Sequence, residues 1–96
     1  MLMAEMIMSV DVKKAVELAR GYLSDVLQVS ALQVLLEEVE LSEDRQFWLI
    51  TLSFPAPRLS PVQVIAGLAN REYKIVRLRA DTGELVSIKI RTLAAA

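Results

Sequence analysis

Residues 71–93 read R-E-Y-K-I-V-R-L-R-A-D-T-G-E-L-V-S-I-K-I-R-T-L, and this stretch decides the fold. Two runs rich in β-branched and aliphatic residues flank Asp81-Thr82-Gly83, a short turn whose glycine can adopt the left-handed backbone conformation. Successive side chains of a β-strand point to opposite faces, so the alternating apolar and basic residues of each run form two separate rows. The stretch therefore predicts an antiparallel hairpin with one apolar row and one basic row.

The two rows fix the expected register of this hairpin. The apolar row consists of Val76, Leu78 and Ala80 before the turn and of Val86, Ile88 and Ile90 after it. Closure of the loop by Ala80 and Glu84 places Val76 opposite Ile88. The same register places Leu78 opposite Val86, so the whole apolar row lies on one side of the ribbon and is expected to join the core.

Upstream of the hairpin, the chain carries the pattern of an amphipathic α-helix. Its apolar residues recur at spacings of three and four, and they are Val12, Ala15, Val16, Ala19, Tyr22, Leu23 and Val26. Ser9 or Asp11 can cap the first turn, so we predict a helix from about residue 11 to residue 27. Gly21 lies inside this helix at a cost of about 1 kcal/mol relative to alanine, and we interpret it as a close contact between helix and sheet.

Two strands and a loop are predicted between this helix and the hairpin. Residues 28–36 fit either a longer helix or the start of a strand, and we favour a break followed by a strand over about 33–41. Irregular alternation at Glu37-Glu38 indicates a β-bulge. Residues 42–46 are polar and form the loop that leads to a strand over 47–54.

A short second helix is expected between the two pairs of strands. Pro55 ends the strand before it, because proline has no N–H to donate to the ladder. Ser60 followed by Pro61 is typical of a helix start, so residues 62–69 form the candidate helix.

The order of these elements defines an α+β fold. We predict one main N-terminal helix packed on an antiparallel sheet of about four strands, with the short second helix before the C-terminal hairpin. Residues 11–93 then form a single domain, residues 1–10 an apolar N-terminal tail and residues 94–96 a frayed C-terminus.

The composition excludes several classes of function. The 96 residues include no cysteine and no histidine, which removes thiolate chemistry and the commonest metal ligand. The remaining candidates for catalysis are a Ser87–Lys89 pair and two groups of carboxylates, for which a solvent-exposed role is the commoner one. The carboxylates are Glu37, Glu38 and Glu40 in one group and Glu43 and Asp44 in the other. We therefore expect no enzyme, no cofactor and no metal site.

Size and hydrophobicity bear on partners and location. Hydrophobic residues make up 54% of the chain, a high share for so small a protein, and a partner that covers some of them would account for it. Residues 1–9 are apolar but contain Glu5, lack Lys and Arg, and are too short to span a membrane. We expect a cytoplasmic protein without a membrane span, with a homodimer as one candidate state.

The basic row of the hairpin is the candidate binding surface. Together with the apolar and aromatic residues expected on the same face, it comprises Phe47, Leu49, Tyr73, Ile75, Arg77, Arg79, Lys89 and Arg91. Arginine, aromatic and aliphatic side chains are typical of protein–protein interfaces, so we predict a non-enzymatic interaction module, in its sharper form an inhibitor or immunity protein. The competing interpretation is an exposed sheet face whose charges are neutralised by Glu38 and Glu40.

Two further functions stay open at this point. The basic row fits a nucleic acid, although a net charge of −1 does not favour phosphate binding. A small ligand fits a pocket between helix and sheet around Trp48 and Tyr22.

The hairpin resembles the C-terminal end of PepSY-like modules, which have a cystatin-like α+β architecture. The likeness rests on residues 73–90, Y-K-I-V-R-L-R-A-D-T-G-E-L-V-S-I-K-I, beside the family pattern Y-x-V-x-h-D-x-x-T-G-x-V, in which h is apolar. Asp81, Thr82 and Gly83 match that turn, with Asp and Thr adjacent in this chain. The resemblance implies a non-catalytic protein that binds or inhibits peptidases or acts as an interaction domain.

Overall fold

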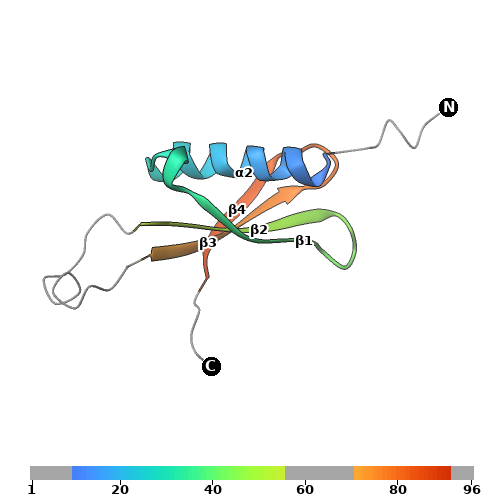
Figure 1. The fold of residues 1–96 in the computed structure, drawn as a ribbon. Coiled ribbons are helices and arrows are strands. Elements are labelled where there is room, and N and C mark those ends of the chain that lie inside the picture. Colours follow the sequence, from blue (N-terminus) through green and yellow to red (C-terminus); the bar gives the residue numbers. More distant parts are fainter. Residues whose placement is uncertain (1–9, 56–70, 92–96) are drawn as a thin grey trace, which may run out of the picture.

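A computed structural model describes residues 10–55 and 71–91 of the chain. They form two layers, with one α-helix on one face of a four-stranded antiparallel sheet (Figure 1). The elements are helix α2 (Val12–Leu27), the 3-10 turn η1 (Ala31–Gln33) and strands β1 (Leu35–Leu41), β2 (Phe47–Pro55), β3 (Arg71–Arg79) and β4 (Leu85–Ile90). The strands lie side by side in chain order, so the predicted α+β class is confirmed. The expected second helix, residues 1–9 of the expected N-terminal tail and the C-terminal tail lie outside the described residues.

Helix α2 forms where the apolar periodicity predicts it. The carboxylate of Asp11 caps the first turn by accepting a hydrogen bond from the Lys14 N–H at 2.8 Å. Gln28 ends the helix in the left-handed conformation, with φ of 59°. The buried stripe consists of Ala15, Ala19 and Leu23, so two small residues bring the helix backbone close to the sheet and one leucine fills the space that remains.

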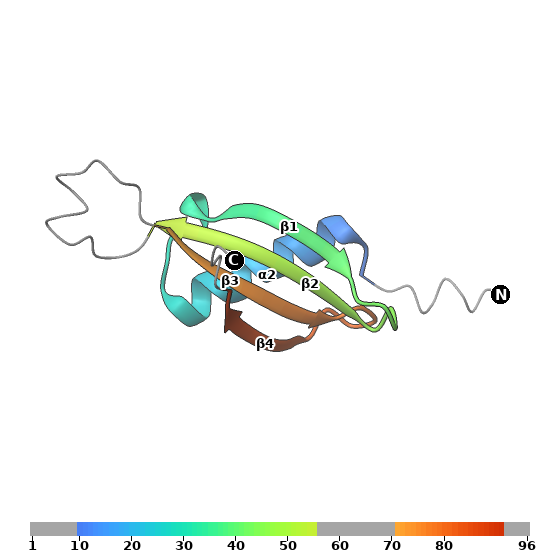
Figure 2. The ribbon, with the colours of Figure 1, turned by 90° about the horizontal axis from the view of Figure 1, so that it is seen from below.

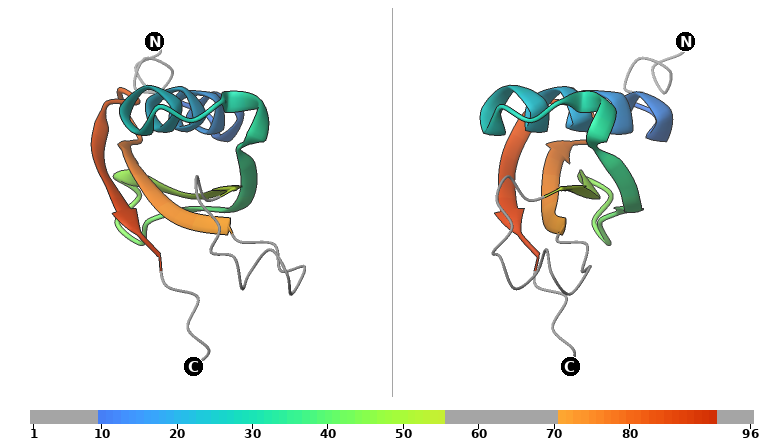
Figure 3. Two further views of the ribbon diagram at one scale, coloured as in Figure 1. Left: turned by 90° about the vertical axis from the view of Figure 1, so that its left-hand side faces the viewer. Right: turned by 60° about the vertical axis from the view of Figure 1, so that its left-hand side comes forward.

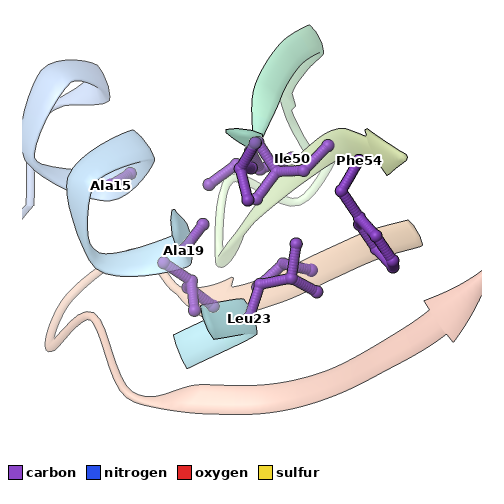
Figure 4. Packing of buried hydrophobic residues seen from close by; sticks show 9 residues of the cluster. Ala15, Ala19, Leu23, Ile50 and Phe54 are labelled. Atoms are coloured by element: carbon purple, nitrogen blue, oxygen red, sulfur yellow. The ribbon is translucent and has the colours of Figure 1, made fainter. Parts of the chain in front are cut away.

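The core lies between α2 and the two central strands. Its sheet side is made by alternate residues of β2 and β3, namely Ile50, Leu52, Phe54, Val76 and Leu78, joined by Val34 ahead of β1. Figure 4 shows Ala19 and Leu23 on the helix lying over this layer, near the labelled Ile50 and Phe54. Alternation along the strands and the 3.6-residue repeat of the helix each bury one face of an element. The face of the sheet turned away from α2 is therefore not part of this core.

The interpretation of Gly21 as a close helix–sheet contact is wrong. Gly21 is exposed, and a Cβ atom built on it meets no atom of the described residues within 4 Å. The close contacts come instead from Ala15 and Ala19, which lie on the opposite side of the helix. Gly21 therefore destabilises the helix without a compensating contact in the described part of the chain.

Replacement of Gly21 by alanine is expected to stabilise the protein. The Gly21→Ala change should raise the free energy of unfolding by about 1 kcal/mol, because it restricts the unfolded backbone and adds no clash. Urea unfolding followed by circular dichroism measures the change. Lys14→Ala, an exposed change in the same helix, serves as the control and should stay within about 0.5 kcal/mol of the parent. A lower unfolding free energy for Gly21→Ala would contradict the prediction.

The hairpin of β3 and β4 forms with a register that differs from the predicted one near the turn. Val76 stands opposite Ile88 as predicted, but Leu78 stands opposite Leu85 because a bulge separates these two pairs. The loop closes between Arg79 and Glu84, whose backbone groups bond at 2.9 Å. Val86 is therefore the extra residue of the bulge and has no partner on β3.

The bulge changes which hairpin residues reach the core. The prediction that the whole apolar row of β4 joins the core is wrong, since Val86 is 47% exposed and Ile90 is 74% exposed. Ile88 and Leu85 pack against the buried cluster. The strand β4 thus presents apolar side chains to solvent at the edge of the sheet.

Strand β1 agrees more closely with the prediction from its sequence. It starts at Leu35, after the 3-10 turn η1 that follows α2, and its register with β2 shifts between Leu36 and Glu38. Glu37 is the bulged residue, as the irregular alternation predicted. The polar loop to β2 is held by Ser42 and Asp44, whose side chains hydrogen bond at 2.6 Å.

Candidate functional site on the outer face of the sheet

The outer face is the side of the sheet turned away from α2. The strand register places all eight candidate residues on it, through the cross-strand pairs Phe47 with Arg79, Leu49 with Arg77, Thr51 with Ile75, Ser53 with Tyr73 and Ile75 with Lys89. Arg91 directly follows β4 and its N–H bonds the carbonyl oxygen of Tyr73 at 2.9 Å. In the views of Figures 2 and 3, the described helix lies on the other side of the sheet.

Arg91 links the two edges of the sheet across this face. It follows β4, yet its guanidinium forms an ion pair with Glu38 of β1, the opposite edge strand. The same Nη1 donates a hydrogen bond to Oγ1 of Thr51 on β2 at 3.0 Å. Thr51 is only 4% exposed, so this bond satisfies a hydroxyl that would otherwise be buried without a partner.

Two shallow hollows share the Arg91–Glu38 ion pair as a wall. The first has a volume of about 290 Å³ and is lined by Glu38, Glu40, Leu49, Thr51, Ile75 and Arg91. The second has a similar volume of about 290 Å³ and is lined by Glu37, Glu38, Thr51, Tyr73 and Arg91. The first hollow has an aliphatic floor of Leu49 and Ile75 with charged groups around it, which suits an amphipathic side chain of a partner.

A second buried hydroxyl organises the end of the face near Tyr73. Ser53 is fully buried, and its Oγ donates to Oε2 of Glu37 at 2.7 Å. The same oxygen accepts a hydrogen bond from Nε of Arg71 at 3.0 Å, and Arg71 also donates to the carbonyl oxygen of Gln33 at 3.4 Å. The bulge at Glu37 therefore has a role, because it brings this carboxylate to the central strand.

The predicted basic row is partly neutralised by acidic neighbours. Arg79 pairs with Asp81 through two hydrogen bonds of 3.0 Å. The hydrogen bond from Arg79 holds the pKa of Asp81 below its usual value, so this pair stabilises the fold at neutral pH and loses that contribution as the pH falls through the lowered pKa. Two of the four basic residues are thus paired, Arg91 with Glu38 as the competing interpretation expected and Arg79 with Asp81, which that interpretation did not include.

Arg77 and Lys89 are the other two basic residues of the row. The guanidinium carbon of Arg77 lies 4.6 Å from the centre of the Phe47 ring, a cation–π contact. The Nε of Arg77 is buried and has no hydrogen-bond partner among the described residues. Neither side chain forms an ion pair within residues 10–55 and 71–91, so both retain charge for another molecule.

The sequence did not predict the polar contacts that organise the face, although it placed Glu37 in a bulge. These contacts involve Glu37, Thr51, Ser53 and Arg71. Two hydroxyl residues at alternate positions of a strand that is otherwise apolar were the available signal, because a buried hydroxyl requires a partner.

Trp48 and Tyr22, around which a ligand pocket was expected, both form hydrogen bonds with the backbone of the chain. Nε1 of Trp48 donates a hydrogen bond to the carbonyl oxygen of Val10 at 2.9 Å. The hydroxyl of Tyr22 donates a hydrogen bond to the carbonyl oxygen of Gly83 at 3.0 Å. Both rings pack against the core. An apolar groove of about 400 Å³ lies elsewhere, between α2 and β1, and is lined by Val12, Lys13, Val16, Glu17, Arg20, Leu36 and Val39.

Within the described ranges, no three acidic side chains approach closely enough to hold a metal ion. No helix in the same part of the chain is long and apolar enough to cross a membrane.

No protein-family model, no curated protein and no solved structure matches the chain. The proposed function therefore rests on the geometry of the site.

Proposed function

We propose that this protein is a non-enzymatic interaction module that binds a protein partner through the outer face of its sheet. The observation that carries the proposal is the first hollow, whose aliphatic floor of Leu49 and Ile75 lies on a face that the helix leaves uncovered. Apolar groups exposed on a flat, organised surface are typical of an interface. The half-buried state of both side chains supports an anchor site for one partner side chain.

The charges around the hollow indicate the chemistry of that partner. Within its lining, Glu38 is paired with Arg91, and Glu40 forms no ion pair among the described residues. Arg77 and Lys89 lie beside the lining on the same face and retain positive charge. A partner segment fits this arrangement when its aliphatic or aromatic side chain enters the hollow and a neighbouring carboxylate meets Arg77 or Lys89 on the side away from Glu40. The side-chain hydrogen bonds of Thr51 and Ser53 order the face beside the hollow before the partner binds. This order lowers the conformational entropy lost on association.

The same residues make a nucleic-acid partner the weaker choice. Two of the four basic side chains of the row are paired with Asp81 and Glu38, so fewer charges meet phosphates. The net charge of −1 agrees with this. The resemblance of the hairpin to PepSY-like modules also supports binding of a protein, in an inhibitor- or immunity-like role, and we place that role in the cytoplasm.

Quantitative affinity purification from the native cell tests the proposal. Tagged parent protein, Lys89→Glu, Ile75→Asp and the helix-surface control Val26→Asp are compared by mass spectrometry. Lys89 and Val26 are exposed, so those two variants keep the core intact. We expect at least one protein that the parent and Val26→Asp retain equally and that both outer-face variants lose by about tenfold or more.

Which variants lose the partner decides whether the outer face is the binding surface. A partner retained by both outer-face variants overturns the assignment of this face. Equal loss with Val26→Asp does the same, because that change lies on α2. Circular dichroism of Ile75→Asp separates loss of binding from loss of the fold.

A further inference from the structure

An apolar groove lies between α2 and the edge strand β1, on the side of the sheet opposite the outer face. It has a volume of about 400 Å³, with Val12 and Val16 on its helix wall and Leu36 and Val39 on its strand wall. Leu36 stands opposite the buried Leu52, so its side chain lies on the helix side of the sheet, yet it is 40% exposed. Val12 on the other wall is 44% exposed. The helix-side face of the sheet is therefore incompletely covered at this edge.

The rim of the groove is charged and carries an unpartnered donor. Its charged residues are Lys13, Glu17 and Arg20, and none of them forms an ion pair within residues 10–55 and 71–91. The Nε of Arg20 is buried and has no hydrogen-bond acceptor among the described residues. Buried donors usually have a partner. With two cations against one carboxylate, the rim favours a segment that brings a negative charge and further acceptors.

Residues 1–9 of the chain have the chemistry that this groove requires. They read M-L-M-A-E-M-I-M-S and contain all four methionines of the protein. Methionine is flexible and polarizable, so it fills irregular apolar surfaces. Glu5 is the only charged side chain of this segment, and it is an anion. The segment therefore matches the groove both in its apolar character and in its charge.

The segment is also long enough to reach the groove from a fixed point. The N–H of Val10 donates to the carbonyl oxygen of Ala80 at 3.0 Å, and the carbonyl oxygen of Val10 accepts from Trp48 at 2.9 Å. The groove begins two residues later at Val12 and follows α2 to Arg20, which is about 12 Å at the rise of an α-helix. Nine extended residues span up to about 30 Å. They can reverse direction at the start of α2 and still follow the groove along its length.

We propose that residues 1–9 fold back and dock in the groove between α2 and β1 of the same chain. Their apolar side chains cover Val12 and Leu36, and the carboxylate of Glu5 lies at the cationic rim near Arg20. The connection through Val10 holds the segment at a local concentration in the millimolar range, which favours it over the same segment of a second copy at micromolar concentration. The docking does not involve the outer face, so it is independent of the proposed partner.

NMR spectra of the full chain with carbon-13 in its methionine methyl groups test the docking. These signals report on residues 1–9 alone, and in the parent they should be displaced from their positions in the free peptide 1–9. Leu36→Asp and Val12→Asp should each lower the docking equilibrium constant by about tenfold or more, because each sets a carboxylate in an apolar wall. The matched controls are Leu35→Asp, on the outer face of the same strand, and Val26→Asp, on the surface of the same helix. Both should keep the signals of the parent.

The methyl signals decide between the alternatives. Free-peptide positions in the parent overturn the proposal, and displaced signals that both groove variants keep assign the docking to another surface. A displacement that fades on dilution from millimolar to micromolar concentration assigns it to a second copy, which also overturns the proposal. Glu5→Lys should weaken docking by about fivefold, and tighter docking of that variant contradicts the role of the rim. Amide spectra show which variants are folded, and the two groove variants lie on different elements, so either one decides the result.

Discussion

Replacement of Leu23 by alanine is expected to lower the free energy of unfolding by about 2–5 kcal/mol, which is the range for a fully buried leucine. Leu23 has no exposed surface and is the one large side chain that α2 buries completely, beside Ala15 and Ala19. The two alanines cannot fill the space that Leu23→Ala leaves, and the strands below are held by their ladder. A small protein has about 5–15 kcal/mol of stability in total, so the loss is a large share of it.

Urea unfolding of Leu23→Ala against the parent measures this effect. Val26→Ala provides the matched control, because it removes a comparable apolar group from the same helix at a position that is 57% exposed. The control should change the free energy of unfolding by no more than about 0.5 kcal/mol. Similar losses for the two variants would mean that α2 does not pack on the sheet through its Leu23 stripe.

Replacement of Gly83 by alanine is expected to cost roughly 2–4 kcal/mol, from a backbone and a packing contribution together. The backbone of Gly83 has φ of +80°, a conformation that costs an L-residue with a side chain. An added Cβ would also lie 2.6 Å from Cδ1 of Leu18 and 3.2 Å from Cγ2 of Val10. The turn therefore needs glycine both for its conformation and for the closeness of the helix.

The two contributions at Gly83 can be measured separately. In a Leu18→Ala background the nearest methyl group is removed and only the 3.2 Å contact with Cγ2 of Val10 stays, so Gly83→Ala should cost mainly the backbone contribution of roughly 1–2 kcal/mol. A double-mutant cycle of the two positions, followed by thermal or urea unfolding, gives the coupling between them. Equal costs of Gly83→Ala in both backgrounds would contradict the packing part of this account.

The turn at Gly83 also connects the fold to the candidate site. Its carbonyl oxygen accepts a hydrogen bond from the hydroxyl of Tyr22. The N–H of Val10 donates a hydrogen bond to the carbonyl oxygen of Ala80 in the same turn. These bonds hold the hairpin end against α2. Since Arg77 and Lys89 project from the same hairpin, a shift of the turn would move half of the proposed binding face.

The fold was predictable to the extent that it depends on local repetition. The spacing of apolar residues predicted α2, and the residue types over 47–54 predicted strand β2. Glu37 was placed in a bulge because its neighbours break the alternation of β1. Each of these follows from a backbone geometry that repeats every few residues.

Two local interpretations were wrong, for different reasons. Gly21 was expected to touch the sheet and Val86 to join the core, and both are exposed at least in part. Gly21 lies on the side of the helix opposite the buried stripe, as the 3.6-residue repeat already requires, whereas the position of Val86 depends on the register of the hairpin. The bulge near the turn moved Val86 out of its row, and one residue of slip is enough to change what a side chain meets.

The sequence by itself determined the helix, the four strands, the hairpin turn and the common face of the candidate residues, because each depends on local periodicity or turn chemistry. Only the tertiary structure decided how that face is organised. The ion pair between Arg91 and Glu38 joins residues 53 positions apart, and the burial of Thr51 and Ser53 depends on arginines that arrive from other strands. Such contacts depend on the register of three strand pairs and on the reach of long side chains across the sheet, which no short window of sequence contains.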